Sequence, residues 1–161
     1  MHTVQILCTL RNVKSFFSVF PSDILPNSIT RDGTVIINAE THTEKGSHWL
    51  AIHFEPKASS AYYFDTYGFS PIIPSIQAFI RHNCTVCVYN TVQLQGLTST
   101  VCGQYCCLFA VYMGKGYTPK QFVGLFNADI ADRQIKILFS LEFGMLQKNQ
   151  RGGQCCSIYK R

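Results

Sequence analysis

Residues 93–107 carry the clearest chemical potential in the sequence. A polar loop that contains Gly96 leads into an apolar pattern with spacings of four, three and four, as one helix face requires: Cys102, Cys106, Phe109 and Met113. Ser99 or Thr100 is the predicted N-cap, since a hydroxyl there accepts a first-turn amide. The pattern places Cys102 in the first turn, where the helix dipole favours a thiolate over a thiol. The alternative is that Cys102 is a small apolar residue at the start of a core helix.

Two further residues suit a cysteine nucleophile, which needs a base for its proton and a group that orients the base. Residues 48–54 alternate in hydropathy, residues 60–66 are rich in aromatics, and the short connection between them predicts an antiparallel hairpin. His48 begins the first strand and Asp65 closes the second, so the pairing brings both residues to the same end of the hairpin. Gln95, seven residues before Cys102, is a candidate amide donor for an oxyanion.

The remaining pattern predicts an α+β fold, with a small mixed or antiparallel sheet packed against helices. The predicted strands span residues 34–39, 48–54, 60–66 and 85–90. The predicted helices span residues 13–20, 72–82, 102–113, 118–127 and 129–146. Ser70 and Pro71 are the predicted cap and first residue of the second helix, with a start shifted to Pro74 as the alternative, and Asp129 or Asp132 opens the last helix. Residues 1–161 are expected to form a single domain, with a loose tail from about residue 147.

The composition is that of a compact globular protein, with 47% hydrophobic and 14% charged residues. The formal charge of +5 comes from the end of the chain, since residues 133–161 hold six Lys and Arg against one acidic residue. That bias makes a nucleic acid a candidate partner, although such charges also occur on ordinary solvated faces. No signal peptide or membrane span is predicted, so we expect an intracellular location and reduced cysteines, of which there are eight.

Cys84 and Cys87 form a Cys-x-x-Cys pair, which raises the alternative of a zinc site completed by Cys102 or Cys106. The two residues between them are β-branched, with no glycine to form a knuckle, and residues three apart on a strand face opposite sides. We therefore expect no metal. A catalytically silent domain that binds DNA or protein is the remaining alternative of another class.

Four separated stretches resemble the adenovirus protease family (adenain): residues 46–49, Gly-Ser-His-Trp; 63–69, Tyr-Phe-Asp-Thr-Tyr-Gly-Phe; 92–96, Val-Gln-Leu-Gln-Gly; and 102–107, Cys-Gly-Gln-Tyr-Cys-Cys. The resemblance extends from about residue 20 to residue 113. It implies an adenain-like fold of the papain-like clan, with the chain order His-Asp-Cys. Similar proteases are encoded by viruses and by Maverick/Polinton transposons, so the resemblance implies a viral or transposon-borne enzyme.

The resemblance also implies a role for each candidate residue. His48 becomes the general base and acid, Asp65 its orienting group, Cys102 the nucleophile and Gln95 an oxyanion donor. Adenain has Glu at the acid position, whereas the SUMO-protease branch of the clan uses Asp. The implied activity is that of a cysteine endopeptidase that cleaves viral or transposon precursor proteins after glycine. The alternative within the clan is a deconjugating protease for ubiquitin-like modifiers.

Regulation is the last property that the resemblance implies. Adenain needs no cofactor for its chemistry but is activated by DNA and by a short viral peptide joined to an enzyme cysteine through a disulfide. Cys84 lies at the matching distance before Gln95 and is the candidate for that disulfide. We expect a monomer without a membrane partner, in an intracellular, nuclear or virion-associated location.

Overall fold

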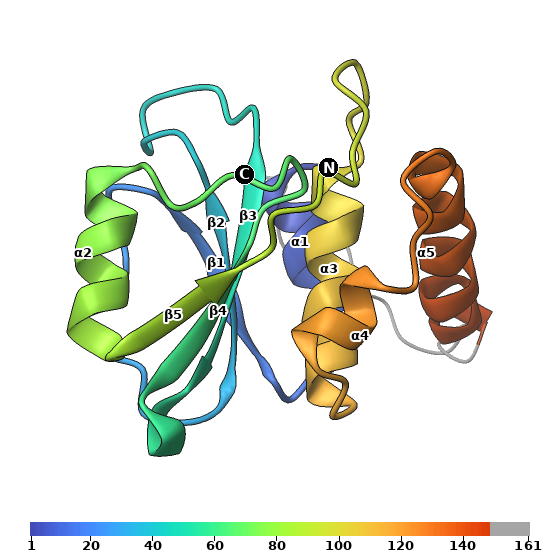
Figure 1. Cartoon of the computed structure of the whole chain (residues 1–161). Coiled ribbons are helices and arrows are strands. Elements are labelled where there is room, and N and C mark those ends of the chain that lie inside the picture. The colour runs from blue at the N-terminus through green and yellow to red at the C-terminus, as the bar shows by residue number, and fades with distance from the viewer. Residues whose placement is uncertain (149–161) are drawn as a thin grey trace, which may run out of the picture.

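The computed structural model describes residues 1–148, which form a mixed sheet with helices on both faces (Figure 1). The helices are α1 (Thr3–Leu10), α2 (Pro74–Asn83), α3 (Cys102–Gly114), α4 (Pro119–Val123) and α5 (Ala131–Lys148). The strands are β1 (Phe16–Pro21), β2 (Gly33–Asn38), β3 (Trp49–Glu55), β4 (Ser60–Phe64) and β5 (Val86–Tyr89), and a 3-10 turn, η1 (Pro56–Ala58), joins β3 to β4. The prediction of an α+β fold is confirmed.

The sheet has the strand order β1-β2-β3-β4-β5. The three central strands are antiparallel to one another, whereas β1 pairs in parallel with β2, and β5 in parallel with β4. Helix α2 covers one face, helices α1, α3 and α4 lie on the other, and α5 packs outside them against α3 (Figure 1). Since β3 is the middle strand and helices lie on both faces of the sheet, both faces of β3 are buried.

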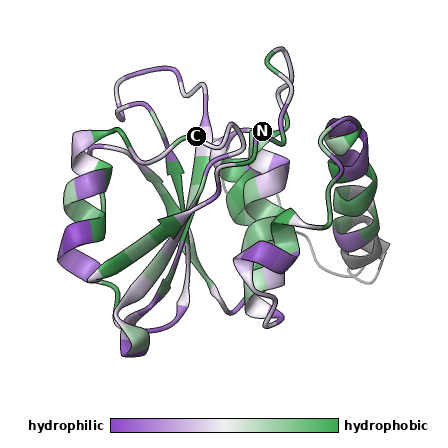
Figure 2. Cartoon of the chain, viewed as in Figure 1, coloured by the Kyte–Doolittle hydropathy of each residue, from purple (hydrophilic) through white to green (hydrophobic). Residues whose placement is uncertain are grey.

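The alternation predicted for residues 48–54 divides β3 between two hydrophobic cores. Leu50, Ile52 and Phe54 pack into the cluster that includes residues of α2. Trp49 and Ala51, on the opposite face, pack into the cluster built around α3. Figure 2 shows hydrophobic residues along the central strands and α3, with hydrophilic residues on the outer side of α2. The alternation is therefore confirmed, with both faces buried.

The hairpin of β3 and β4 is also confirmed. Its register pairs Ala51 with Phe64 and Glu55 with Ser60, so the residue before β3 and the residue after β4 emerge at the same end. Those residues are His48 and Asp65. Antiparallel pairing alone is thus sufficient to bring the two candidates together.

Helix α3 begins at Cys102 as predicted, and nearly its whole circumference is buried. The prediction that Ser99 or Thr100 caps it is wrong, because Val101 is the N-cap and no side chain fills that role. The Val101 carbonyl accepts from the amides of Gln104 and Tyr105. Ser99 instead belongs to the preceding loop, which is organised around Gln95 and leaves the first turn of α3 open beside Cys102.

The N-terminal helix predicted at residues 13–20 is wrong. Residues 16–21 form strand β1, whose parallel pairing with β2 decides the conformation of a short apolar run that has no periodicity of its own. The helix lies earlier, as α1, which buries Ile6 and Leu10 while its polar residues face outward. The predicted start at Ser70 and Pro71 is also wrong, since α2 begins at Pro74, in the first-turn position that proline favours.

The later helices follow the prediction in part. Thr118 caps α4 by accepting from the Gln121 amide, as the Thr-Pro start predicts, but α4 ends at Val123 rather than near residue 127. Helix α5 begins at Ala131. The tail predicted to be loose lies mostly outside the described residues. No helix within residues 1–148 combines the length and the apolar character that crossing a membrane requires.

Replacing Phe109 with alanine is expected to destabilise the fold by about 3–5 kcal/mol, because a large ring is lost from a close-packed core. Phe109 stacks on Phe64 with ring centroids 4.8 Å apart and meets Phe122 edge-on at 5.4 Å. Denaturant unfolding monitored by circular dichroism measures the change. Phe69→Ala is the control, since that ring is 61% exposed and its loss should alter the free energy of unfolding by less than about 0.5 kcal/mol.

Candidate active site

His48 and Asp65 form a direct pair at the end of the hairpin. Nε2 of His48 lies 2.9 Å from Oδ1 of Asp65, and the Asp65 side chain is only 5% exposed. A buried carboxylate at this distance fixes the plane of the imidazole and stabilises its protonated form.

Asp65 is itself held by backbone and side-chain contacts from two neighbouring segments. Its Oδ1 accepts from the Tyr67 amide at 2.9 Å. The buried side chain of Asn90 accepts from the Asp65 amide at 3.0 Å and donates to the Asp65 carbonyl at 2.6 Å. The loop after β5 therefore locks the residue that orients His48. Sequence analysis did not identify Asn90, because a single asparagine at a strand end carries no distinguishing signal.

Cys102 completes the cluster from the opposite side. It is the first residue of α3 and is 5% exposed. Burial alone would raise the pKa of its thiol, but hydrogen bonds from the His48 side chain and from the backbone amides of Trp49 and Gly103 hold the pKa below its ordinary value. The surroundings of Cys102 therefore favour the thiolate.

The pKa of His48 is shifted in the opposite direction, upward. Burial lowers its pKa, but the hydrogen bonds to Asp65 and Cys102, together with the negative charges of both, raise the pKa to about 9. Since Nε2 faces Asp65, the sulfur interacts with the other ring nitrogen, Nδ1. The two pKa shifts act in the same sense, because both favour a thiolate beside an imidazolium, the ion pair expected of an activated cysteine nucleophile.

This ion pair predicts a bell-shaped dependence of kcat/KM on pH. Activity is expected to fall in acid as the Cys102 thiolate takes up a proton, and in alkali as His48 loses its proton near its pKa of about 9. The raised pKa of His48 also stabilises the fold below its unfolded value of 6.5, and this contribution is lost as the pH rises through about 9. Alkylation rates of Cys102 measured over the same pH range should show the same two limbs, and an alkaline limb complete near neutrality would contradict the pairing.

The loop that precedes β3 holds His48 in place through Glu40. The Glu40 carboxylate accepts from the Ser47 hydroxyl, from the Ser47 amide at 2.8 Å and from the His48 amide at 3.4 Å. Tyr67 covers the other side, with its ring centroid 5.0 Å from that of His48. Neither residue was identified from the sequence. Glu40 lies in a loop without periodicity, and the ring contact of Tyr67 depends on how the turn after β4 folds.

Gln95 lies beside this cluster and is 2% exposed. Its Oε1 accepts from the Thr66 hydroxyl at 2.8 Å, and its Nε2 donates to the Ser99 carbonyl at 2.7 Å and to the Tyr67 hydroxyl at 3.4 Å. The bond from Thr66 fixes which end of the amide carries the hydrogens. One amide hydrogen of Gln95 therefore points toward the tyrosine that packs on His48.

Cys84 and Cys87 lie away from this cluster. Cys84 is the C-cap residue of α2, and its thiol donates to the Ile80 carbonyl at 3.4 Å. Cys87 lies in β5, and both side chains pack against the core on the α2 face. Burial raises the pKa of both thiols, that of Cys87 to about 11. Among residues 1–148, no group of three or more His, Cys, Asp or Glu side chains is arranged to hold a metal ion.

Comparison with known proteins connects this geometry to viral proteases. The family model described as adenovirus endoprotease matches residues 15–152. The protease of human adenovirus A serotype 12 is 28% identical over 149 residues, a match that covers 78% of this chain and 69% of the relative. The protease of bovine adenovirus 2 is 34% identical over 86 residues, covering 46% of this chain and 42% of the relative.

Solved structures support the fold. The crystal structure of an ASFV protease superposes with a TM-score of 0.58 at 14% sequence identity, covering 81% of this chain and 63% of that protein. At this identity the likeness concerns the fold alone. In several of these matches the chain spans only part of the relative's length, from 42% to 63%.

Proposed function

Since this chain belongs to the adenovirus endoprotease family, a family of cysteine proteases, we propose that it is itself a cysteine endopeptidase and that His48, Asp65 and Cys102 carry out its reaction. The observation that carries the proposal is the position of the His48 side chain, whose Nε2 lies 2.9 Å from Asp65 and which also hydrogen-bonds to Cys102. A buried histidine between a carboxylate and a thiol at a helix start is the arrangement that thiol-based acyl transfer needs.

In the proposed acylation step, the Cys102 thiolate attacks the carbonyl carbon of the scissile bond, and the carbonyl oxygen becomes an oxyanion. The first-turn amides of α3 and the Nε2 hydrogen of Gln95 that is directed at Tyr67 are the candidate donors for that oxyanion, since the other Nε2 hydrogen bonds to the Ser99 carbonyl. Nδ1 of the His48 imidazolium then gives its proton to the leaving nitrogen. The carbon–nitrogen bond breaks, and the acyl group remains on the sulfur as a thioester.

Deacylation reverses the role of His48. The neutral imidazole takes a proton from a water molecule as that water attacks the thioester carbonyl. The carbon–sulfur bond breaks and the acid product leaves. Cys102 is released as the thiolate beside a protonated His48, so the ion pair is regenerated without an external cofactor. Asp65 keeps its hydrogen bond to Nε2 and so keeps Nδ1 directed at the sulfur throughout.

We propose polypeptides with glycine before the scissile bond as substrates, on the basis of the family resemblance around His48 and Cys102. The test is a matched set of peptides with Gly, Ala or Val at that position, accompanied by folded fusions of ubiquitin-like modifiers. Preference for the Gly peptides supports the endopeptidase. Cleavage restricted to the folded fusions would favour a deconjugating protease, and cleavage of neither would favour a binding domain.

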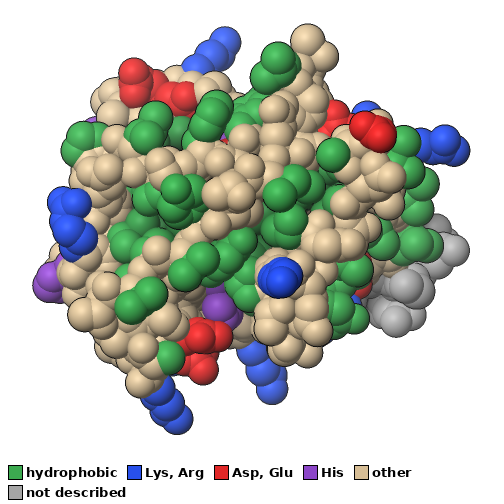
Figure 3. All heavy atoms as spheres, viewed as in Figure 1, with side chains coloured by type: hydrophobic (Ala, Val, Ile, Leu, Met, Phe, Trp, Pro, Cys, Tyr) green, Lys and Arg blue, Asp and Glu red, His purple; other side chains and the backbone are tan. Residues whose placement is uncertain are grey.

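A regulatory role for Cys84 is a second proposal, since β5 is an edge strand that follows it directly. Val86 and Val88 are 56% and 54% exposed, and hydrophobic side chains gather across the middle of the face seen in Figure 3. A peptide that adds a strand to this edge would gain backbone hydrogen bonds and these contacts. A disulfide carried by the peptide would exchange with the Cys84 thiolate and release the peptide's other thiol.

Because β5 leads directly to Asn90, and Asn90 holds Asp65, an ordered edge would steady the site. Turnover of the parent and of Cys84→Ser is measured with and without a disulfide-bearing peptide, with and without a polyanion, and at low and high salt, which tests both modes of regulation. DNA stimulation should fall steeply with added salt. Equal rates in every condition would remove the regulatory proposal and leave the catalytic one intact. We propose action within infected cells or virions, because the similar proteins are proteases of adenoviruses.

A further inference from the structure

The loop that carries Gln95 is fixed to helix α5 by one long-range hydrogen bond. The amide of Gly96, the residue directly after Gln95, donates to Oδ2 of Asp132 at 3.1 Å. Asp132 lies in the first turn of α5, where the positive end of the helix dipole favours a carboxylate. A segment 36 residues further along the chain therefore contacts the backbone beside the candidate oxyanion donor.

Glycine at position 96 makes this approach possible. A Cβ atom added there would lie 3.0 Å from Oδ2 of Asp132, closer than most Cβ contacts. A side chain at position 96 would require the carboxylate to shift by a few tenths of an ångström. The local sequence is thus matched to the contact with α5.

The opposite side of the loop is anchored to Thr66. The Thr66 carbonyl accepts from the amides of Leu94 and Gln95 at 2.8 and 3.1 Å, and its hydroxyl donates to Oε1 of Gln95. These bonds set the start of the loop and the orientation of the Gln95 amide. Asp132 sets the position of the next peptide unit, so Gln95 is held between an anchor on each side.

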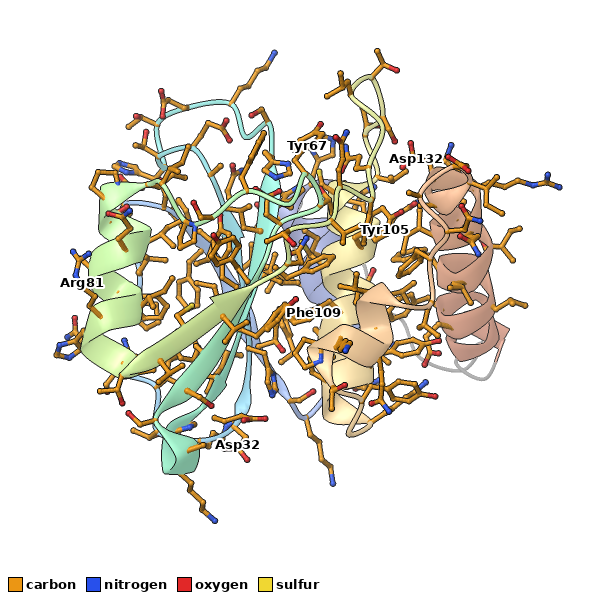
Figure 4. The ribbon with its side chains drawn as sticks, in the orientation of Figure 1. Asp32, Tyr67, Arg81, Tyr105, Phe109 and Asp132 are labelled. Atoms are coloured by element: carbon orange, nitrogen blue, oxygen red, sulfur yellow. The ribbon has the colours of Figure 1, made fainter. Side chains whose placement is uncertain are left out.

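Asp132 also lies close to α3, the helix that carries Cys102, and so connects that helix with the loop that carries Gln95. Figure 4 shows Asp132 at the end of α5 near Tyr105 of α3. Tyr67 lies on the opposite side of the loop that carries Gln95 (Figure 4). Within residues 1–148, Oδ1 of Asp132 and the Tyr105 hydroxyl are buried without a hydrogen-bond partner. Burial, and then the charge of Asp132, raise the pKa of Tyr105, which places the two groups within electrostatic reach. Oδ2 of Asp132 therefore bonds to the Gly96 amide, whereas Oδ1 has no hydrogen-bond partner that would compensate for its burial.

We propose that Asp132 is a positioning residue for the reaction, which fixes the Gly96 peptide so that the Gln95 amide faces the oxyanion. This inference rests on the proposed function of Gln95 and Cys102. It makes the docking of α5 a requirement for turnover, although Asp132 touches neither the triad nor the substrate. The Cys102–His48 pair does not depend on it.

The experiment compares the parent with Asp132→Ala, Asp132→Asn and Glu142→Gln on a peptide substrate. Loss of a hydrogen bond to a charged group, worth about 1.5 kcal/mol or more, predicts a roughly tenfold fall in kcat for Asp132→Ala, with KM nearly unchanged. Asp132→Asn keeps an acceptor oxygen for Gly96 and should recover most of kcat. Alkylation of Cys102 should keep the parental rate and pH dependence in all three variants.

Glu142→Gln is the matched control, since it removes the negative charge from another α5 contact, the 2.7 Å ion pair with Lys115 at the C-cap of α3, which has no connection to the loop. Its kcat should equal that of the parent. Melting temperatures identify any variant that fails to fold, and Asp132→Asn keeps the test decisive if Asp132→Ala does. Parental kcat in Asp132→Ala, or an equal loss in Glu142→Gln, overturns the positioning role alone. A parent that cleaves no peptide overturns the proposed function, and the positioning role with it.

Discussion

Cys102→Ala is expected to abolish peptide cleavage, with a loss of at least about 10⁴-fold in kcat, because the nucleophile of acyl transfer is removed. His48→Ala should show a loss of similar size, since the thiolate then lacks both its partner and the proton donor for the leaving amine. The two effects should not add in the double variant, because the residues act as one unit. Single-turnover kinetics with a fluorogenic Gly-containing peptide measure these losses.

Folding and labelling provide the controls for this prediction. Cys102→Ala replaces one small buried side chain, so its circular dichroism spectrum should match that of the parent. Cys8→Ala removes an exposed cysteine and should keep full activity. Substantial cleavage by a purified Cys102→Ala protein would exclude Cys102 as the nucleophile and leave the cluster without a catalytic role.

Asp65→Asn is expected to lower kcat/KM by about 10²–10⁴-fold while preserving the fold, because the asparagine occupies nearly the same volume. The carboxylate contributes a hydrogen bond and a negative charge that raise the pKa of His48 to about 9. Without them the pKa of His48 should fall, and the amide can also stabilise the wrong tautomer. The alkaline limb of the pH profile should therefore move toward neutrality along with the loss of rate.

A second His–Asp pair supplies a matched control. Asp23 and His42 lie on the surface, with Oδ2 of Asp23 2.5 Å from Nδ1 of His42. Asp23→Asn makes the same chemical change in a pair that has no hydrogen bond to His48, Asp65 or Cys102, and the alkaline limb of its pH profile, which reports the pKa of His48, should coincide with that of the parent. If Asp65→Asn retained both the parental rate and the parental alkaline limb, another group would have to orient His48.

The parts of the fold that followed from sequence are those with a strong local period. Alternation along residues 48–54 predicts a strand and assigns its faces, and the short connection to β4 requires antiparallel pairing. Strand β1 and helix α1 were not predicted, because neither has a strong local period. The run at residues 16–21 becomes a strand only through its long-range pairing with β2, and α1 is a short helix with two buried residues.

The candidate site divides in the same way. His48, Asp65 and Cys102 occupy positions at element ends that local patterns predict, and the structure places them together. Asn90 and Asp132 act on the site through contacts between segments that are distant in sequence, and Glu40 acts through the folding of its own loop back onto His48. A single polar residue in a loop gives no indication of its partner, so these contacts required the folded structure.

The near-complete burial of α3 predicts that this protein loses activity at a lower temperature than the one at which it melts. Amides of a helix enclosed by the core should exchange with deuterium only through large-scale unfolding, whereas the loops that hold Gln95 and precede His48 lie at the surface, where Leu97 is 82% exposed. Heating should therefore loosen those loops while the helix that bears the nucleophile remains native. Inactivation is expected to precede the melting transition, so an intact melting curve would not establish that a preparation is active.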